Sequence, residues 1–178
     1  AAAAATGGRV TVPGLARDSL QGDVRFLDVL RAMGCTVAWS DEGVTVHGPE
    51  RLRGGDVDLN AMSDMTMTLA ALAPFAEGPV RIRGVGHIRH QESDRLSALV
   101  TELRRLGQEV REFEDGLEII PRPVRPAVVE THGDHRIAMA FTVAGLRADG
   151  IAIANPVCVT KTFPDFFQRL ETLVAPQR

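Results

Sequence analysis

The sequence lacks a long apolar run, and it is poor in cysteine, lysine and aromatic residues. Its longest stretch without a charged side chain runs from Met65 to Ala76 and is interrupted by Pro74. A helix that crosses a membrane needs roughly 20 consecutive apolar residues. We therefore expect no membrane-spanning segment and a cytoplasmic location.

Cysteine and net charge are both low. The two cysteines, Cys35 and Cys158, lie far apart and fit neither a metal-binding nor a redox spacing. Two buried thiols in a reducing compartment are the expected outcome. The 20 basic and 23 acidic side chains give a formal net charge of −3. This balance provides no broad field for nucleic acid, so we expect no nucleic-acid partner.

Lysine is nearly absent. Lys161 is the single lysine among the 20 basic residues, and tyrosine does not occur. Lysine is ordinarily one of the commonest residues, which indicates a bias that replaces lysine by arginine. A planar guanidinium cannot replace a compact ammonium everywhere. Lys161 is therefore either a chance survivor or a residue that its site requires.

The chain has 178 residues and an apolar content of 44%, enough for one globular domain or for one domain and a part. It opens with five alanines followed by Thr-Gly-Gly, without an initiating Met or a charged leader. An alanine run ending at glycine is typical of the end of a helix. We interpret the chain as a portion of a longer protein.

Segments recur along the chain at shifts of 70 to 73 residues. The matched ranges are 8–14 with 78–84, 30–37 with 103–110, and 41–46 with 114–119. A third copy begins at Asp134, 70 residues after Asp64, and continues through Ile153. The pattern predicts an internal repeat of about 70 residues.

The elements of one copy follow from its periodicity. Apolar residues of one helical face predict a helix that begins after Glu92 or Ser93 and ends at Gly107. Further predictions are a helix over 64–75, a strand over 80–83, a hairpin of 108–113 with 117–121, and a proline-rich connector over 121–126. We expect an α/β fold of β-α-β-α-β-β units, in which helices pack on small sheets.

Polar residues stand at the predicted helix starts, namely Asp64, residues 92–95 and residues 133–136. Asp and Ser at such positions can simply cap the helix. Arg95 and Arg136 are different, because a cation in the first turn opposes the helix dipole. Their positions favour an anionic ligand held by guanidinium groups and helix N-termini together.

A metal site is the competing interpretation. His87 and His90 are three residues apart, and so are His132 and His135. The first pair lies in a loop, and neither pair is joined by a cysteine or by an HExxH motif. We expect neither a metal nor a cofactor.

Three segments resemble motifs of the 3-phosphoshikimate 1-carboxyvinyltransferases, also called EPSP synthases. Residues 89–96 are similar to RxKE[ST]DRL, residues 133–140 to GDHR-x-AM, and residues 161–166 to KT[FY]P-x-[FY]. The resemblance also includes residues 21–23 and 63–68, so it covers the whole chain in order. Three motifs in the right order make it highly specific.

The resemblance implies a two-domain enzyme, each domain built from three β-α-β-α-β-β units, with the active site between the domains. Such enzymes transfer the enolpyruvyl group of phosphoenolpyruvate to the 5-hydroxyl of 3-phosphoshikimate and release phosphate, in aromatic amino-acid biosynthesis, without a metal or organic cofactor. Residues 1–178 are then expected to be a C-terminal domain, incomplete at its N-terminus. We expect the intact enzyme to be a monomer, and this portion without its N-terminal domain to lack turnover.

The same resemblance implies roles for individual residues. Asp64 matches the carboxylate that accepts the hydroxyl proton. Glu92 matches the acid that protonates the methylene carbon of phosphoenolpyruvate and later helps to take a proton back. The cations that match the phosphoenolpyruvate contacts are Arg95, Arg136 and Lys161.

Two positions leave questions open. Gln91 stands where the family has a lysine, so it can bind shikimate by hydrogen bonds but not by charge. His87 occupies a ring-contacting position and is either a second shikimate contact or a simple loop histidine. Two alternatives remain: the enolpyruvyl transferase that acts on UDP-N-acetylglucosamine, which lacks the combined Glu-Ser-Asp-Arg and Gly-Asp-His-Arg pattern, and a non-catalytic repeat module that binds a phosphorylated ligand.

Overall fold

The computed structural model describes residues 1–174. Its helices are α1 (Ala2–Thr6), α2 (Phe26–Ala32), α3 (Thr66–Leu72), α4 (Arg95–Arg105), α5 (His135–Gly145) and α6 (Phe166–Val174). Short 3-10 helices are η1 (Gly22–Arg25), η2 (Asn60–Met65), η3 (Ala73–Phe75), η4 (Gly86–His90) and η5 (Pro156–Lys161). The strands are β1 (Arg9–Pro13), β2 (Thr36–Ser40), β3 (Gly43–His47), β4 (Gly55–Asp58), β5 (Val80–Arg83), β6 (Glu109–Phe113), β7 (Gly116–Ile120), β8 (Ala127–Val129) and β9 (Ile151–Ile153).

The strands form three small sheets, with orders β1-β3-β2, β4-β5-β7-β6 and β8-β9. β6 and β7 are the predicted hairpin, and their antiparallel register pairs Phe113 with Gly116. The pairs β4 with β5 and β8 with β9 are parallel, and a helix lies between their strands in the chain. Helices that alternate with small sheets confirm the predicted α/β class.

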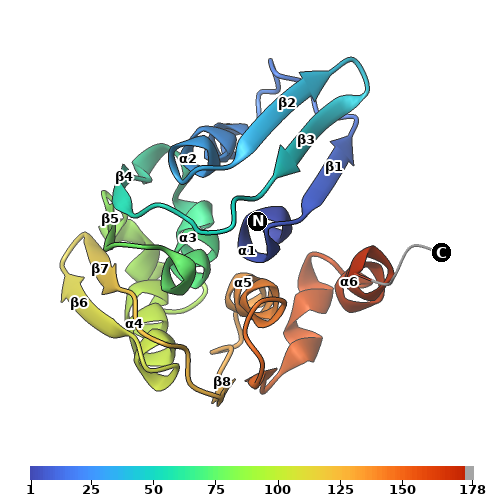
Figure 1. Cartoon of the computed structure of the whole chain (residues 1–178). Helices are drawn as coiled ribbons and strands as arrows, with labels where there is room; N and C mark the ends of the chain where they lie inside the picture. Colours follow the sequence, from blue (N-terminus) through green and yellow to red (C-terminus); the bar gives the residue numbers. More distant parts are fainter. Residues whose placement is uncertain (175–178) are drawn as a thin grey trace.

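Three helices lie at the centre of the fold, where α5 packs against the shorter helices α1 and α3 (Figure 1). Their buried sides are made largely of small residues, including Ala3, Ala4, Ala5, Ala70, Ala71, Ala138 and Ala140. Small side chains allow helix axes to approach closely, so the starts of α3 and α5 are held near each other. This arrangement is what brings the polar residues at the two helix starts together.

Helix α4 confirms the periodicity of the sequence, because Leu96, Leu99, Val100 and Leu103 are all buried on one face. The predicted N-cap is wrong by one or two positions. The capping side chain is Asp94, whose Oδ1 accepts a hydrogen bond from the backbone N–H of Ser97 at 3.0 Å.

The predicted helix over 64–75 is shorter than expected. Its first residues belong to η2, where Met62 has non-helical angles, and the α-helix begins only at Thr66. Its end tightens into η3, which contains Pro74. Asp64 therefore lies in the 3-10 turn that precedes α3 and not at a helix N-cap.

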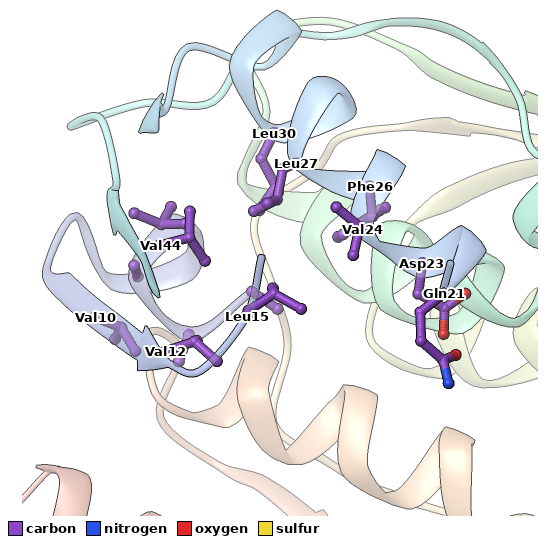
Figure 2. A pocket seen from close by; sticks show the side chains of 14 residues that line it. Val10, Val12, Leu15, Gln21, Asp23, Val24, Phe26, Leu27, Leu30 and Val44 are labelled. Atoms are coloured by element: carbon purple, nitrogen blue, oxygen red, sulfur yellow. The ribbon is translucent and has the colours of Figure 1, made fainter. Parts of the chain in front are cut away.

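An apolar cavity of about 350 Å³ lies between the β1-β3-β2 sheet and α2. Figure 2 shows Val10, Val12 and Val44 on one side and Leu27 and Leu30 on the other. Two polar side chains, Gln21 and Asp23, also line it. This apolar cavity is separate from the cluster of Glu92, Arg95 and Arg136, so binding of small anions has to be sought elsewhere.

Cys35 is buried, but Cys158 is only half-buried, so the expectation of two buried thiols is wrong for Cys158 because η5 lies near the surface. Among residues 1–174, no helix has both the length and the apolar character that a membrane crossing requires.

Candidate active site

The polar helix starts meet in one cleft of about 420 Å³. Its lining comes from η2, from the turn before α4 and the first residue of α4, from the first turn of α5 and from the residue after η5. The lining residues are Asp64, Gln91, Glu92, Arg95, His135, Arg136 and Thr162. Helix N-termini and guanidinium groups that face one hollow are well suited to a small anion.

Arg95 is the centre of this cluster, with only 3% of its side chain exposed. Its Nε donates to Asp134 Oδ2 at 2.7 Å, and its Nη1 and Nη2 lie 3.1 Å from Asp64 Oδ1 and Glu92 Oε2. Gln91 Oε1 accepts a further hydrogen bond from Nη1. A buried guanidinium that makes four hydrogen bonds has little freedom to move.

Asp134 is completely buried and performs two structural tasks. Its Oδ1 caps α5 by accepting the backbone N–H of Arg136 at 2.8 Å, and its Oδ2 accepts Nε of Arg95. Burial raises the pKa of Asp134, but the hydrogen bonds from Arg95 and Arg136 outweigh burial and hold the pKa below its usual value. The carboxylate therefore ties the start of α5 to the start of α4.

The other two cations lie on the open side of the cluster. Arg136 Nη2 is 2.7 Å from Asp64 Oδ2, and its side chain is 31% exposed. Lys161 is 58% exposed and donates from Nζ to Glu92 Oε1. The hydrogen bond from Lys161 holds the pKa of Glu92 below its usual value.

His135 is buried beside the same carboxylate. Its Nδ1 lies 3.2 Å from Glu92 Oε2, close enough for an ion pair, yet Nδ1 makes no aligned hydrogen bond within the described residues. Glu92 is thus adjacent to Arg95, His135 and Lys161, which gives it more cationic or potentially cationic neighbours than Asp64 has.

Most of the predicted site residues come together. Those that line the cleft are Asp64, Gln91, Glu92, Arg95 and Arg136. Lys161 reaches the cluster through Glu92. His87 lies exposed on η4 and shares no hydrogen bond or ion pair with the cluster in the part of the chain that is described.

Sequence reasoning did not include Asp134, His135 and Thr162 among the site residues. Asp134 and His135 directly precede Arg136 in the Gly-Asp-His-Arg segment, so the sequence already indicated that they lie near Arg136. Thr162 follows Lys161 directly and had no separate signal.

Glu92, Asp134 and His135 also form a group whose potential ligand atoms lie within 4.8 Å of one another. A metal ion there would compete with the Arg95 guanidinium for Asp134 and with the Lys161 ammonium for Glu92. Carboxylates that are already paired with cations are poor metal ligands, and we assign no metal to this group.

Comparison of the sequence with family models identifies the family. A family model described as EPSP synthase (3-phosphoshikimate 1-carboxyvinyltransferase) matches residues 1–170. The chain belongs to the EPSP synthase family.

Curated relatives in this family include proteins of Nostoc punctiforme and of Arabidopsis thaliana. The 3-phosphoshikimate 1-carboxyvinyltransferase of Nostoc punctiforme is 56% identical over 169 residues, which are 95% of this chain and 40% of that protein. The chloroplastic protein of Arabidopsis thaliana is 48% identical over 181 residues, covering 97% of this chain and 35% of that protein. The chain therefore spans about 40% of the length of relatives such as the Nostoc protein.

Solved structures agree with the family and with the fold. An EPSP synthase from Acinetobacter baumannii superposes with a TM-score of 0.83 at 27% identity, over 97% of this chain and 43% of that one. The enolpyruvyl transferase NikO from Streptomyces tendae has a TM-score of 0.69 at 23% identity and covers 93% of this chain and 38% of its own. This second likeness shows the shared fold alone.

Proposed function

We propose that this chain supplies one half of the active site of a 3-phosphoshikimate 1-carboxyvinyltransferase. The reaction transfers the enolpyruvyl group of phosphoenolpyruvate to the 5-hydroxyl of 3-phosphoshikimate, with release of phosphate. The observation that supports this best is the convergence of Asp64, Glu92, Arg95 and Arg136 on one cleft, joined by Lys161.

The charge of the cluster explains why half a site is not enough. Three carboxylates (Asp64, Glu92 and Asp134) face three cations (Arg95, Arg136 and Lys161), so these six groups carry no excess positive charge. Both substrates are multiply charged anions, which need further cations to be bound tightly. We propose that an N-terminal domain of the same enzyme provides them and that residues 1–178 belong to a C-terminal domain without turnover of its own.

The addition step uses both carboxylates on the open side. The 5-hydroxyl oxygen forms a bond to C2 of phosphoenolpyruvate while Asp64 accepts the hydroxyl proton. The methylene carbon C3 receives a proton from the carboxyl group of Glu92, which gives a tetrahedral intermediate. In the elimination step C3 loses a proton to Glu92, the bond between C2 and the phosphate oxygen breaks, and the proton held by Asp64 leaves with the phosphate, which restores both carboxyl groups to their starting states.

The cations stabilise the negative charge that these steps move. Arg95 is buried and is held by the buried carboxylate of Asp134, so its guanidinium is preorganised toward the cleft. Arg136 and Lys161 are more exposed and would exchange their carboxylate partners for the carboxylate and phosphate of phosphoenolpyruvate. Gln91 and His87 remain the proposed shikimate contacts, although Gln91 already binds Arg95 and His87 lies away from the cluster.

We further propose that the intact enzyme is a monomer and that it is located in the cytoplasm. We also propose that the order of elements in residues 1–174 reflects an internal repeat. This repeat is supported by a strand, a 3-10 helix, an α-helix and a hairpin that occur in this order over β1 to β3 and again over β5 to β7.

The test is phosphate release by the full-length enzyme with phosphoenolpyruvate and 3-phosphoshikimate. Glu92→Gln removes the acid but keeps the shape, and we expect turnover to fall by roughly 10²- to 10⁴-fold while phosphoenolpyruvate binding changes far less. Glu77→Gln, at an exposed glutamate 3.9 Å from Arg51, is the matched control and should retain full turnover. Absence of phosphate release by the unaltered enzyme would refute the proposed reaction, and equal turnover of Glu92→Gln would refute the role of Glu92.

A further inference from the structure

Helix α4 contacts the loop before α5 at a second place, two helical turns from Arg95. Glu102 follows Arg95 by seven residues and therefore lies on the same side of the helix. Its side chain is completely buried. One oxygen, Oε2, accepts the backbone N–H of Glu130 at 3.0 Å, and the other, Oε1, lies 3.0 Å from Nε2 of His132.

The remaining neighbour of this carboxylate is Arg105, whose Nη1 lies 3.4 Å from Oε2. Arg105 is 41% exposed and points its Nη1 to the carbonyl of Val128 as well. Glu102 is therefore satisfied by three contacts, of which two belong to the segment that leads into α5.

His132 has an unusual backbone. Its φ is 53°, the only positive φ of a non-glycine residue in the described part of the chain, and the next residue, Gly133, has a φ of 71°. The N–H of Asp134 donates to the carbonyl of Thr131 at 2.8 Å, which closes a four-residue turn. Two successive left-handed residues are the signature of a type I′ turn. Histidine is one of the residues that adopt this conformation more often than most, and here its ring is anchored, because Nε2 lies 3.0 Å from Glu102 Oε1.

The turn leads directly into the candidate active site. Asp134 caps α5 and pairs with Arg95, His135 lies against Glu92, and Arg136 contacts Asp64. The loop is thus fixed to α4 at two points, by Glu102 at its beginning and by Arg95 at its end.

We propose that Glu102 and His132 are positioning residues for the groups of α5 that bind phosphoenolpyruvate. Glu102 holds the imidazole of His132, the imidazole stabilises the left-handed turn, and the turn sets the direction from which Arg136 enters the cleft. Neither residue lines the cleft, so both act through Arg136 and Asp134. The role of Arg136 rests on the proposed function; the effect on the turn does not.

Substitutions at His132 separate its contact with Glu102 from its left-handed backbone conformation. His132→Gln keeps an N–H donor near the place of Nε2, whereas His132→Asn and His132→Gly suit the left-handed backbone but do not reach Glu102. His132 is one-third exposed, so these variants leave the core intact. His47→Gln, at an exposed histidine at the end of β3, is the matched control.

The experiment measures KM and kcat of the full-length variants, together with amide hydrogen exchange of Asp134 and Arg136. We expect His132→Asn and His132→Gly to raise the KM for phosphoenolpyruvate about tenfold, to lower kcat less than threefold, and to speed exchange of both amides at least tenfold. His132→Gln and His47→Gln should resemble the unaltered enzyme in all three measurements. If the contact with Glu102 were unimportant, the Asn and Gly variants would match the unaltered enzyme. The Gln variant would then have the highest KM and the fastest amide exchange.

An unchanged KM in the Asn and Gly variants overturns the inference, whatever their exchange rates. If the unaltered enzyme released no phosphate, the proposed reaction would fail, and the exchange rates would then decide alone whether the ring of His132 holds the turn.

Discussion

The candidate active site has a buried half and an open half that use the same chemistry for different ends. In the buried half Arg95 meets Asp134, with exposed fractions of 3% and 0%. In the open half Lys161 meets Glu92, with exposed fractions of 58% and 34%. Both are cation–carboxylate contacts of short range.

The difference in exposure indicates that the buried pair has a structural role and that the exposed pair is available for binding. A buried pair is expensive to break, because the partner that remains is an unpaired charge away from water. An exposed pair contributes little, because water and salt screen it. The buried half therefore fixes the geometry, and the open half is free to exchange its partners for a ligand.

The largest effect is expected where the buried pair is broken. Asp134→Ala leaves Arg95 without its buried carboxylate partner and α5 without its cap, and it should lower the free energy of unfolding by about 3–5 kcal/mol. Urea denaturation of the full-length protein measures this loss. A loss below about 1 kcal/mol would mean that Asp64 and Glu92 neutralise Arg95 without help.

The buried pair should also respond to acid. Because the folded state lowers the pKa of Asp134, its charge stabilises the fold at a pH above the ordinary Asp value of about 3.9, and this contribution is lost as the pH falls through the lower, folded value. Asp134→Asn keeps an oxygen that can cap α5 but removes the charge, and it should cost about 1–3 kcal/mol at pH 7.

The direction of this pH dependence is tested by comparing the unfolding midpoints of Asp134→Asn and of the unaltered protein at pH 7, 5, 4 and 3. The difference between the two midpoints should become smaller below about pH 4. A difference that stays constant with pH would show that Asp134 does not act through its charge.

A smaller effect on stability, with a clear effect on binding, is expected in the open half. Lys161→Met should change the free energy of unfolding by less than about 1 kcal/mol. In the full-length enzyme both Lys161→Met and Lys161→Arg should raise the KM for phosphoenolpyruvate, by about tenfold or roughly 1.4 kcal/mol for Met. Unaltered kinetics of Lys161→Arg would show that the single lysine survived by chance.

The smallest effect is expected at a surface pair of similar length. Arg31 Nη1 lies 2.6 Å from Asp28 Oδ1, with side chains that are 40% and 71% exposed. Arg31→Met should change the free energy of unfolding by less than about 0.5 kcal/mol. If this loss approached that of Asp134→Ala, separation and not burial would govern the strength of such pairs here.

Local features of the fold were accessible from the sequence. The face of α4 and the β6–β7 hairpin depend on spacing within about a dozen residues, and both were predicted. The exact cap of α4 was not predicted, because Ser93 and Asp94 are both good N-cap residues and stand next to each other in the sequence. The late start of α3 likewise depends on the kink at Met62, which has no sequence signal.

The members of the site were easier to predict than their pairing. Arg95 and Arg136 were notable because each opposes a helix dipole, and an anionic ligand was inferred. The anions beside Arg95 in the described structure are carboxylates of the protein, and the closest of these, Asp134, lies 39 residues away in the sequence. Contacts between such distant residues depend on how helices pack, which periodicity does not reveal.

The contact between Lys161 and Glu92 has a consequence for proton exchange. While the ammonium is bound to Glu92, it favours the ionised carboxylate. An anion that draws Lys161 away weakens this preference, so the affinity of Glu92 for a proton rises when the anion binds. Capture of an anion by Lys161 and uptake of a proton by Glu92 are then linked in one equilibrium.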